Sequence, residues 1–251
     1  MQIITTAVIK GGTGKTTTAA ALAQAAAAAG KRVLAIDLDP QANFTFTLGA
    51  DQNEAGSYEL LHEAEPKSLI QSTEQGIDVI SASPDLATEQ TKAGSIKRLQ
   101  EAIEPLKKSY DFIFIDTPPT IGELTYNALQ ACTGLIVPLE ADNNSLQGLY
   151  QITDIAHQMQ GHNPELEIIG VILTRYDNRP KINRYLKEAI TKAGAEAGAP
   201  FLGAIRAGVA IREAQALQQS VYDYAPRSKP AQDYKALFEQ ISKGKKRRKA
   251  K

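Results

Sequence analysis

The chain has 251 residues, of which 43% are hydrophobic and 22% charged, a balance that suits one soluble α/β domain with a single core. Its one cysteine, Cys132, excludes an internal disulfide and a thiolate metal cage, and we expect it to be a buried small side chain. The sequence shows no signal peptide and no apolar run long enough to span a membrane, which favours a cytoplasmic protein.

Short apolar runs rich in β-branched residues alternate with helical patterns along the whole chain. Such alternation, with strands that are apolar on both faces, predicts a mostly parallel sheet with helices on both faces, in a single α/β domain over residues 1–242. The apolar periods place strands at 3–9, 32–36, 77–81, 112–115, 135–138, 168–173 and 201–205, and helices at 15–29, 95–109, 146–160, 183–197 and 233–242.

A glycine-rich turn lies between the first strand and the first helix, where residues 10–16 read Lys-Gly-Gly-Thr-Gly-Lys-Thr. Small residues let successive N–H groups turn inward around a phosphate, and the helix N-terminus adds a positive dipole. In such a P-loop, Lys15 would reach the β- and γ-phosphates and the Thr16 hydroxyl would bind Mg²⁺. The predicted nucleotide-binding residues are Lys10, Gly11, Gly12, Thr13, Gly14, Lys15, Thr16 and Thr17.

Two features separate this turn from the usual Gly-x-x-x-x-Gly-Lys-Ser/Thr pattern. Ile9 stands where the first glycine belongs, and a second lysine, Lys10, stands at the entrance of the loop. One use for Lys10 is to cross a dimer interface and neutralise charge on the partner's nucleotide, as an arginine finger does. The alternatives are a solvated lysine and, for the whole turn, a loop that binds nothing.

Three carboxylates follow strands that should end beside the turn. Asp116 ends an apolar strand, where a P-loop fold needs an acid for Mg²⁺, although a strand-ending Asp can also serve as a cap. Asp37 and Asp39 follow the second strand, and a carboxylate there can orient the attacking water or complete the Mg²⁺ shell. The candidate residues for a metal site are therefore Thr16, Asp37, Asp39 and Asp116.

Four segments in the same order resemble the ParA/MinD family of P-loop ATPases. Residues 10–17 are similar to its deviant Walker A motif, 37–43 (Asp-Leu-Asp-Pro-Gln-Ala-Asn) to its Asp-x-Asp-Pro-Gln-x-Asn segment, and 112–119 to its Walker B and switch II. Residues 224–229, Tyr-Ala-Pro-Arg-Ser-Lys, are similar to a segment of the ParA branch. The resemblance implies a slow ATPase with ATP and Mg²⁺ as cofactors, and with Lys10, Lys15 and Asp39 as catalytic residues.

The resemblance to the ParA branch also implies partners and a role in the cell. ATP would drive a sandwich homodimer that binds DNA without sequence preference, and a ParB-type adaptor would stimulate hydrolysis, so we expect a nucleoid-associated partition ATPase. No helix-turn-helix segment precedes the P-loop, and one cysteine argues against iron–sulfur relatives. A MinD-like membrane-positioning ATPase and a small-molecule kinase or ligase stay open as alternatives.

Residues 243–251 carry seven basic and no acidic residues, which leaves 21 basic against 28 acidic residues in the rest of the chain. We expect a disordered basic tail that lacks the apolar face of a membrane anchor and contacts DNA phosphates, with a merely solubilising tail as the alternative. The predicted DNA-binding residues are Arg212, Arg227, Lys229, Lys245, Lys246, Arg247 and Arg248.

One segment departs from the family. Residues 205–210 read Ile-Arg-Ala-Gly-Val-Ala where the family often has Ile-Pro-Arg-Asn-Val-Arg. The proline that lines the adenine in many members is absent, and two basic positions are Ala. The contacts to the base therefore stay open, and Arg206, Arg212 or the tail are candidates to replace the missing charges.

Overall fold

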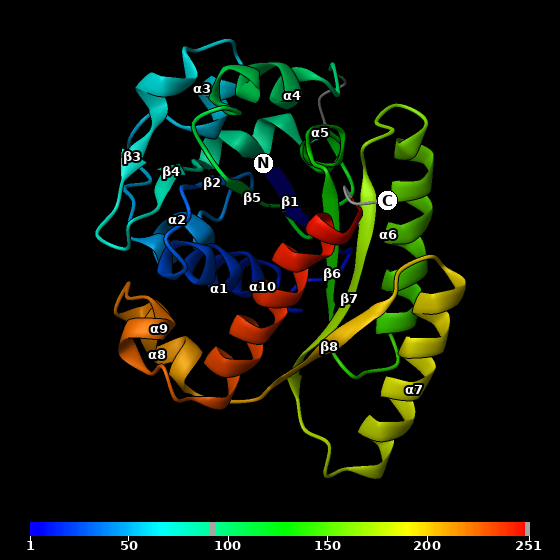
Figure 1. Cartoon of the computed structure of the whole chain (residues 1–251). Coiled ribbons are helices and arrows are strands. Elements are labelled where there is room, and N and C mark those ends of the chain that lie inside the picture. Colours follow the sequence, from blue (N-terminus) through cyan, green and yellow to red (C-terminus); the bar gives the residue numbers. More distant parts are fainter. Residues whose placement is uncertain (91–93, 249–251) are drawn as a thin grey trace.

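The computed structural model describes residues 1–90 and 94–248, with side chains up to residue 243. One eight-stranded sheet with the order β3-β4-β2-β5-β1-β6-β7-β8 runs through the centre of the molecule (Figure 1). Its strands are β1 (Gln2–Thr6), β2 (Val33–Asp37), β3 (Gln71–Ser72), β4 (Asp78–Ile80), β5 (Phe112–Asp116), β6 (Gly134–Leu139), β7 (Glu167–Tyr176) and β8 (Phe201–Arg206).

The helices connect and cover these strands. The longer ones are α1 (Lys15–Ala28), α5 (Glu123–Ala131), α6 (Ser145–Gln160), α7 (Lys181–Glu196) and α10 (Lys229–Arg248). The shorter ones are α2 (Asn43–Leu48), α3 (Ser57–Leu60), α4 (Arg98–Ile103), α8 (Ala210–Ala216) and α9 (Val221–Tyr224), with 3-10 turns η1 (Pro66–Leu69), η2 (Pro84–Glu89) and η3 (Glu104–Leu106).

The parallel sheet predicted from the strand–helix alternation is confirmed. Every neighbouring strand pair is parallel except β3 with β4, which is antiparallel. In register, Asp116 at the end of β5 pairs with Thr6 of β1 on one side and Asp37 of β2 on the other. The carboxyl ends of three central strands therefore meet at one edge, which is where ligands bind in open α/β sheets.

Two apolar layers cover the two faces of the sheet. One layer packs α1, α2 and α10 against the strands, and the other packs α4, α5, α6 and α7. The many alanines of α1 have little volume, so α10 lies close beside it (Figure 1), and the hydroxyls of Thr18 and Tyr234 come within 3.1 Å. This packing holds the amino-terminal end of α1, which follows the glycine-rich turn.

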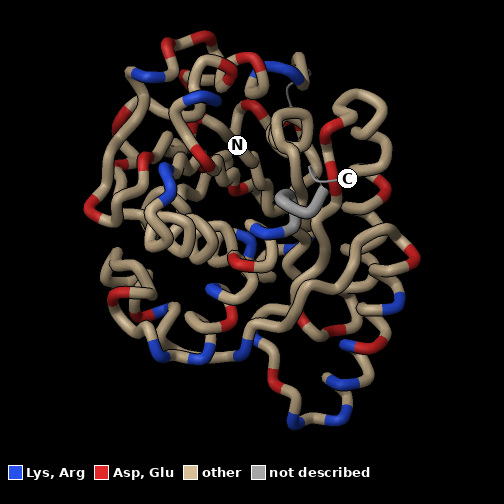
Figure 2. Tube along the Cα trace, viewed as in Figure 1, with Lys and Arg blue, Asp and Glu red and all other residues tan. Residues whose placement is uncertain are grey.

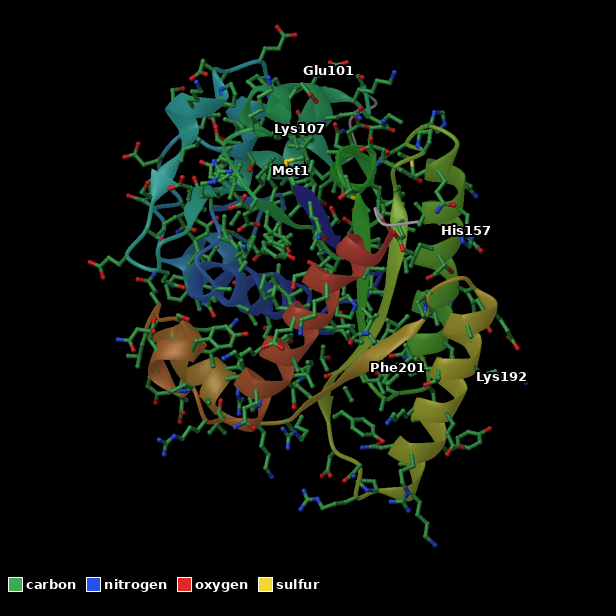
Figure 3. The ribbon with its side chains drawn as sticks, viewed as in Figure 1. Met1, Glu101, Lys107, His157, Lys192 and Phe201 are labelled. Carbon is green, nitrogen blue, oxygen red and sulfur yellow. The ribbon has the colours of Figure 1, made fainter. Side chains whose placement is uncertain are left out.

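The amphipathic helix α7 packs against β7 and β8, the last two strands of the sheet. Lys192 points outward from α7, whereas Phe201, at the start of β8, packs against the core on the inner side of the helix (Figure 3). Cys132 is buried, as the sequence predicted. Over the described part of the chain, no helix combines the length and the apolar character that crossing a bilayer requires.

Several expected boundaries were wrong. The last helix spans Lys229–Arg248 and continues past 242, where the apolar period ends, because Lys and Arg are themselves good helix formers. The helix expected at 95–109 is shorter, with a 3-10 turn at Pro105. The short helices α2, α3, α8 and α9 carry too few turns for a periodic signal. The boundary at residue 242 between an ATPase domain and a basic tail stays a prediction. Residues 249–251 lie outside the described residues.

Candidate nucleotide site

A pocket of about 500 Å³ opens at the carboxyl ends of the central strands, beside the glycine-rich turn. It brings residues of the turn together with the loops that follow β2 and β5, the end of β7, and helices α2 and α8. The lining residues are Gly11, Gly12, Gly14, Lys15, Thr16, Thr17, Asp39, Gln41, Asn43, Phe46, Thr47, Pro119, Arg175, Gln215 and Ala216.

The backbone of the turn needs glycine at two positions. Gly12 has φ 78° and Gly14 has φ 87°, in the left-handed region that side chains disfavour. A Cβ atom at Gly14 would also lie 3.2 Å from Thr174 Cγ2. Helix α1 begins at Lys15, so its free N–H groups and dipole face the pocket. These are the elements of an anion site.

Lys15 is largely buried and its amine donates to the carbonyl of Lys10 at 3.1 Å. Burial lowers the pKa of the Lys15 amine, and the carboxylates of Asp116 and Asp39 oppose that shift. The cation therefore lies between the turn and two acids, where an anionic ligand would gain most from it.

Asp116 is fully buried between two hydroxyls. Thr16 donates to its Oδ2 at 2.5 Å, and Thr6 donates to its Oδ1 at 3.2 Å. Burial, reinforced by the nearby carboxylate of Asp37, raises the pKa of Asp116 to about 8. The hydroxyl and carboxylate oxygens of Thr16 and Asp116 are ligands of the kind that Mg²⁺ prefers.

Asp37 is also fully buried, but both of its oxygens already accept protein hydrogen bonds. Its Oδ1 accepts from the Asp39 amide at 3.0 Å, and its Oδ2 accepts from the amide and the hydroxyl of Thr45, each at 2.8 Å. Burial raises the pKa of Asp37 to about 6 against these hydrogen bonds. The carboxylate thus fixes the loop after β2 to the start of α2, and its direct role in holding a metal stays a prediction.

Asp39 lies two residues further along that loop and faces the pocket. Its Oδ1 accepts from the Gln41 amide at 3.0 Å, and only 8% of the residue is exposed. Within the described residues, no three His, Cys, Asp or Glu side chains gather closely enough to hold a metal by themselves.

Lys10, the first residue of the turn, forms an ion pair with Asp142, in the loop after β6. Asp142 uses its other oxygen to accept from the amides of Asn144 and Ser145 at the start of α6. The structure therefore gives Lys10 a partner within its own chain, which the sequence did not predict.

A second pocket of about 90 Å³ adjoins the first and shares Gly14, Thr17, Arg175 and Gln215 with it. Its wall is mostly apolar, which suits the flat face of a base. Arg206, in the segment that departs from the family, forms a fork with Asp233 of α10, with the Nη2–Oδ1 distance at 2.7 Å. The remaining lining residues are Thr174, Ile205, Gly208, Ile211, Arg212, Pro230 and Tyr234.

Comparison with known proteins gives a consistent assignment. Residues 1–168 match the family model described as an AAA domain. The chromosome-partitioning ATPase Soj of Thermus thermophilus is 35% identical over 92% of this chain and 92% of its own length. The sporulation initiation inhibitor protein Soj of Bacillus subtilis is 34% identical over 93% of this chain and 95% of its own length. The chain belongs to the ParA/Soj family of partition ATPases.

Solved structures agree on the fold. Cobyrinic acid a,c-diamide synthase from Mycobacterium smegmatis, solved with ADP and magnesium, superposes with a TM-score of 0.84 at 29% identity, over 98% of this chain and 96% of that chain. A putative plasmid partition protein from Borrelia burgdorferi bound to AMPPNP superposes with a TM-score of 0.82 at 25% identity, over 97% of this chain and 99% of that chain. The cell division ATPase MinD of Pyrococcus furiosus superposes with a TM-score of 0.80 at 26% identity, over 96% of this chain and 98% of that chain. These neighbours confirm the P-loop ATPase fold expected from the ParA/MinD resemblance.

The structure brings most of the predicted nucleotide and metal residues around the larger pocket. Arg227 and Lys229 are exposed beside α10, whereas Arg212 is exposed but also lines the second pocket. The side chains of Lys245, Lys246, Arg247 and Arg248 lie outside the described residues.

Sequence reasoning missed several residues of the site. Arg175 lines both pockets, and Gln215 reaches them from α8. Arg175 could have been found from its place at the end of a strand, since the ends of parallel strands share one edge. Gln215 and the partner of Lys10, Asp142, have no local signal in the sequence.

Proposed function

We propose that this chain is an ATP-dependent DNA partition ATPase, active in the cytoplasm at the nucleoid. ATP and Mg²⁺ would bind in the larger pocket, with the base in the smaller one. One observation carries the proposal. The phosphate turn and a group of exposed Lys and Arg side chains after β7 and β8, called the basic edge below, lie on the same, carboxyl-terminal side of the sheet. A change in the nucleotide site can therefore act directly on a surface that suits DNA.

The residues fit a magnesium–nucleotide ligand. The amides of the glycine-rich turn and Lys15 would hold the phosphates, while Thr16 and Asp116 would hold the metal, which supplies charge neutralisation to the phosphates. Asp39, which faces the pocket, would orient the attacking water. Asp37, tied to Thr45, would keep that loop in position. Hydrolysis would then proceed by positioning and without a covalent enzyme intermediate.

ATP would also drive a sandwich homodimer. Lys10 lies at the entrance of the turn and is held there by Asp142, through an ion pair in which both side chains are about one-third exposed. A pair of that kind is weak, so a more concentrated negative charge can displace the carboxylate. The phosphates of a nucleotide in a second copy of this chain would offer that charge, and hydrolysis would stay slow until the dimer forms.

The basic edge consists of exposed side chains that follow β7 and β8. Lys and Arg positions gather along the lower edge of the molecule in Figure 2, from the loop before α7 to the start of α10. Its members are Arg179, Lys181, Arg184, Arg212, Arg227 and Lys229. Such a surface can contact phosphates without reading sequence.

The opposite edge of the sheet has the reverse charge. Residues 51–90, around β3 and β4, hold nine acidic residues and a single basic one, Lys67. This asymmetry supports one orientation on DNA, with the β3–β4 edge turned away from the phosphates. The proposal has two further parts. A ParB-type adaptor would stimulate hydrolysis, and the basic residues at the end of α10 would add a DNA contact.

The test is the molar mass of the full chain by light scattering with ATP, ADP or no nucleotide, each with Mg²⁺. A doubling of mass with ATP alone is the expected result, and a monomer in all three conditions would contradict the dimer. Two parallel assays separate the other classes. ATP-dependent flotation with anionic liposomes would indicate a membrane-positioning ATPase, and transfer of phosphate to a small acceptor would indicate a kinase or ligase.

A further inference from the structure

The end of β7 is joined to the glycine-rich turn by two side chains in succession. Thr174 donates through Oγ1 to the carbonyl of Thr13 at 2.7 Å and also lies 3.1 Å from the carbonyl of Leu139. Arg175 donates through Nη2 to the carbonyl of Gly12. Two consecutive carbonyls of the turn are therefore held by two consecutive residues of one strand.

This arrangement decides where the N–H groups of the turn point. In a planar trans peptide, the C=O and N–H bonds point in opposite directions. Holding the carbonyls of Gly12 and Thr13 toward β7 therefore directs the N–H groups of Thr13 and Gly14 away from β7. Gly11, Gly12 and Gly14, which surround these peptides, line the larger pocket.

Arg175 adopts an unfavourable backbone conformation in making its contact. Its φ is 49°, in the left-handed region, where an L side chain crowds its own backbone. The pairing of β7 with β8 shifts between Leu173 and Tyr176, which is where Arg175 leaves the regular ladder. The strand therefore bulges at the position from which the side chain reaches the turn.

Core packing does not account for that strain. The side chain of Arg175 is 61% exposed, and its other contact is with Glu140, from Nε to Oε1 at 2.5 Å. An ion pair as exposed as this one contributes little to stability. What distinguishes Arg175 is its place where the two pockets meet, together with its hydrogen bond to Gly12.

We propose that Thr174 and Arg175 are positioning residues of the phosphate site. They fix the peptides of the glycine-rich turn so that the N–H groups of Thr13 and Gly14 are directed at the phosphates before the nucleotide arrives. Preorganised donors bind an anion without reorganisation. The inference rests on the proposed binding of ATP and extends the site to the end of β7.

The test is calorimetric titration of Mg²⁺–ATP into the full chain and its variants. Thr174→Val removes the donor but keeps the shape, Thr174→Ser keeps the donor, and Arg175→Met removes the guanidinium from an exposed side chain. Thr153→Val is the matched control, because buried Thr153 donates to the carbonyl of Leu149 at 2.9 Å, within α6. Glu140→Gln tests whether the ion pair of Arg175 suffices to explain its effect.

We expect Thr174→Val, whose partner Thr13 is buried, to weaken ATP binding about tenfold, the usual consequence of removing one hydrogen bond to a buried group. Arg175→Met, whose partner Gly12 is exposed, should weaken it about fivefold. Thr174→Ser should restore most of the affinity, and Thr153→Val and Glu140→Gln should bind within about twofold of the parent chain. The amide resonances of Thr13 and Gly14 should shift in the nucleotide-free Arg175→Met variant, which a general loss of stability would not cause.

Parental affinity in Thr174→Val and Arg175→Met would overturn the inference, as would an equal loss in Thr153→Val. If Thr174→Val fails to fold, Arg175→Met and the amide resonances decide the question alone. A parent chain that binds no ATP would contradict the proposed function instead, so the two failures can be told apart.

Discussion

The amine of Lys10 and the carboxylate of Asp142 form an ion pair that joins the entrance of the phosphate turn to the loop after β6. The two residues are 132 positions apart in the chain. The parallel order β1–β6 brings them together, because both residues follow the carboxyl ends of adjacent strands. In the proposed cycle, this pair must break before Lys10 can reach a second subunit.

The first prediction concerns this ion pair. Asp142→Asn keeps the oxygen that accepts from the start of α6 but removes the charge opposite Lys10. We expect it to favour the ATP-bound dimer about two- to fivefold, which is the range for a partly exposed pair. Lys10→Ala should prevent dimerisation. Light scattering over a protein dilution series measures both, and unchanged dimerisation in Lys10→Ala would remove Lys10 from the interface.

The second prediction concerns the buried acid. Because the folded pKa of Asp116 is about 8, above its unfolded value, the folded nucleotide-free chain holds a proton at neutral pH that the unfolded chain releases, and this difference lowers the stability of the fold. This destabilisation should diminish as the pH falls from about 8 toward 4. Asp116→Asn should therefore raise the melting temperature at pH 8 by a few degrees.

The same variant should lose Mg²⁺-dependent ATP hydrolysis, since an amide is a poorer ligand for the metal. Thermal melts in EDTA at pH 6 and pH 8, together with phosphate-release assays, measure the two effects. A variant that is less stable than the parent at pH 8 would contradict this account of Asp116.

The third prediction separates binding from chemistry. Asp39→Ala should still bind ATP but hydrolyse it about 10²- to 10⁴-fold more slowly, the usual contribution of a positioned acid–base group. Lys15→Ala should lose ATP binding. Asp154→Ala, an exposed carboxylate on α6, is the control for charge removal. Parental turnover in Asp39→Ala would assign the attacking water to another group.

The fourth prediction concerns Cys132. Burial raises the pKa of its thiol to about 11, so the reactive thiolate is scarce in the folded chain at pH 8. A thiol reagent should label it only as the chain unfolds, with the same denaturant midpoint as the loss of helix signal. Because the thiol has a raised folded pKa, its burial should also cost stability as the pH rises above about 9. Rapid labelling of the native chain would show that the core around α5 opens.

The site shows how far sequence reasoning reached. The phosphate turn, Asp116 and the parallel sheet follow from local signals: glycines before a helix, an acid after an apolar strand, and β-branched runs. Asp142 meets Lys10 through strand order, and Gln215 reaches the site from a helix of two turns, neither of which leaves a periodic signal in the sequence. Arg175 could have been found from its place at the end of a parallel strand. The fork between Arg206 and Asp233 likewise depends on α10 packing against β8, a tertiary contact.

The fifth prediction compares the basic edge with the end of α10. The salt dependence of DNA binding is the slope of the logarithm of the binding constant against the logarithm of the salt concentration. Replacing Arg227 and Lys229 with Ala should reduce this slope by nearly one unit for each phosphate that these side chains neutralise. Removing residues 243–251 should add to that effect if the tail also binds DNA. Lys67→Ala, from the acidic β3–β4 edge, is the matched control and should bind as the parent does. An equal weakening in Lys67→Ala would mean that net charge alone matters.

The measurement that tests the central claim most directly is fluorescence anisotropy of a labelled random-sequence duplex, titrated with the full chain at low salt in Mg²⁺. We predict binding with ATP, tighter still for Asp39→Ala, which would hold ATP longer, and little binding with ADP or without nucleotide. Affinity should fall steeply as salt rises. Binding that is equal in all three nucleotide states, or absent with ATP, would contradict the claim that ATP switches this chain onto DNA.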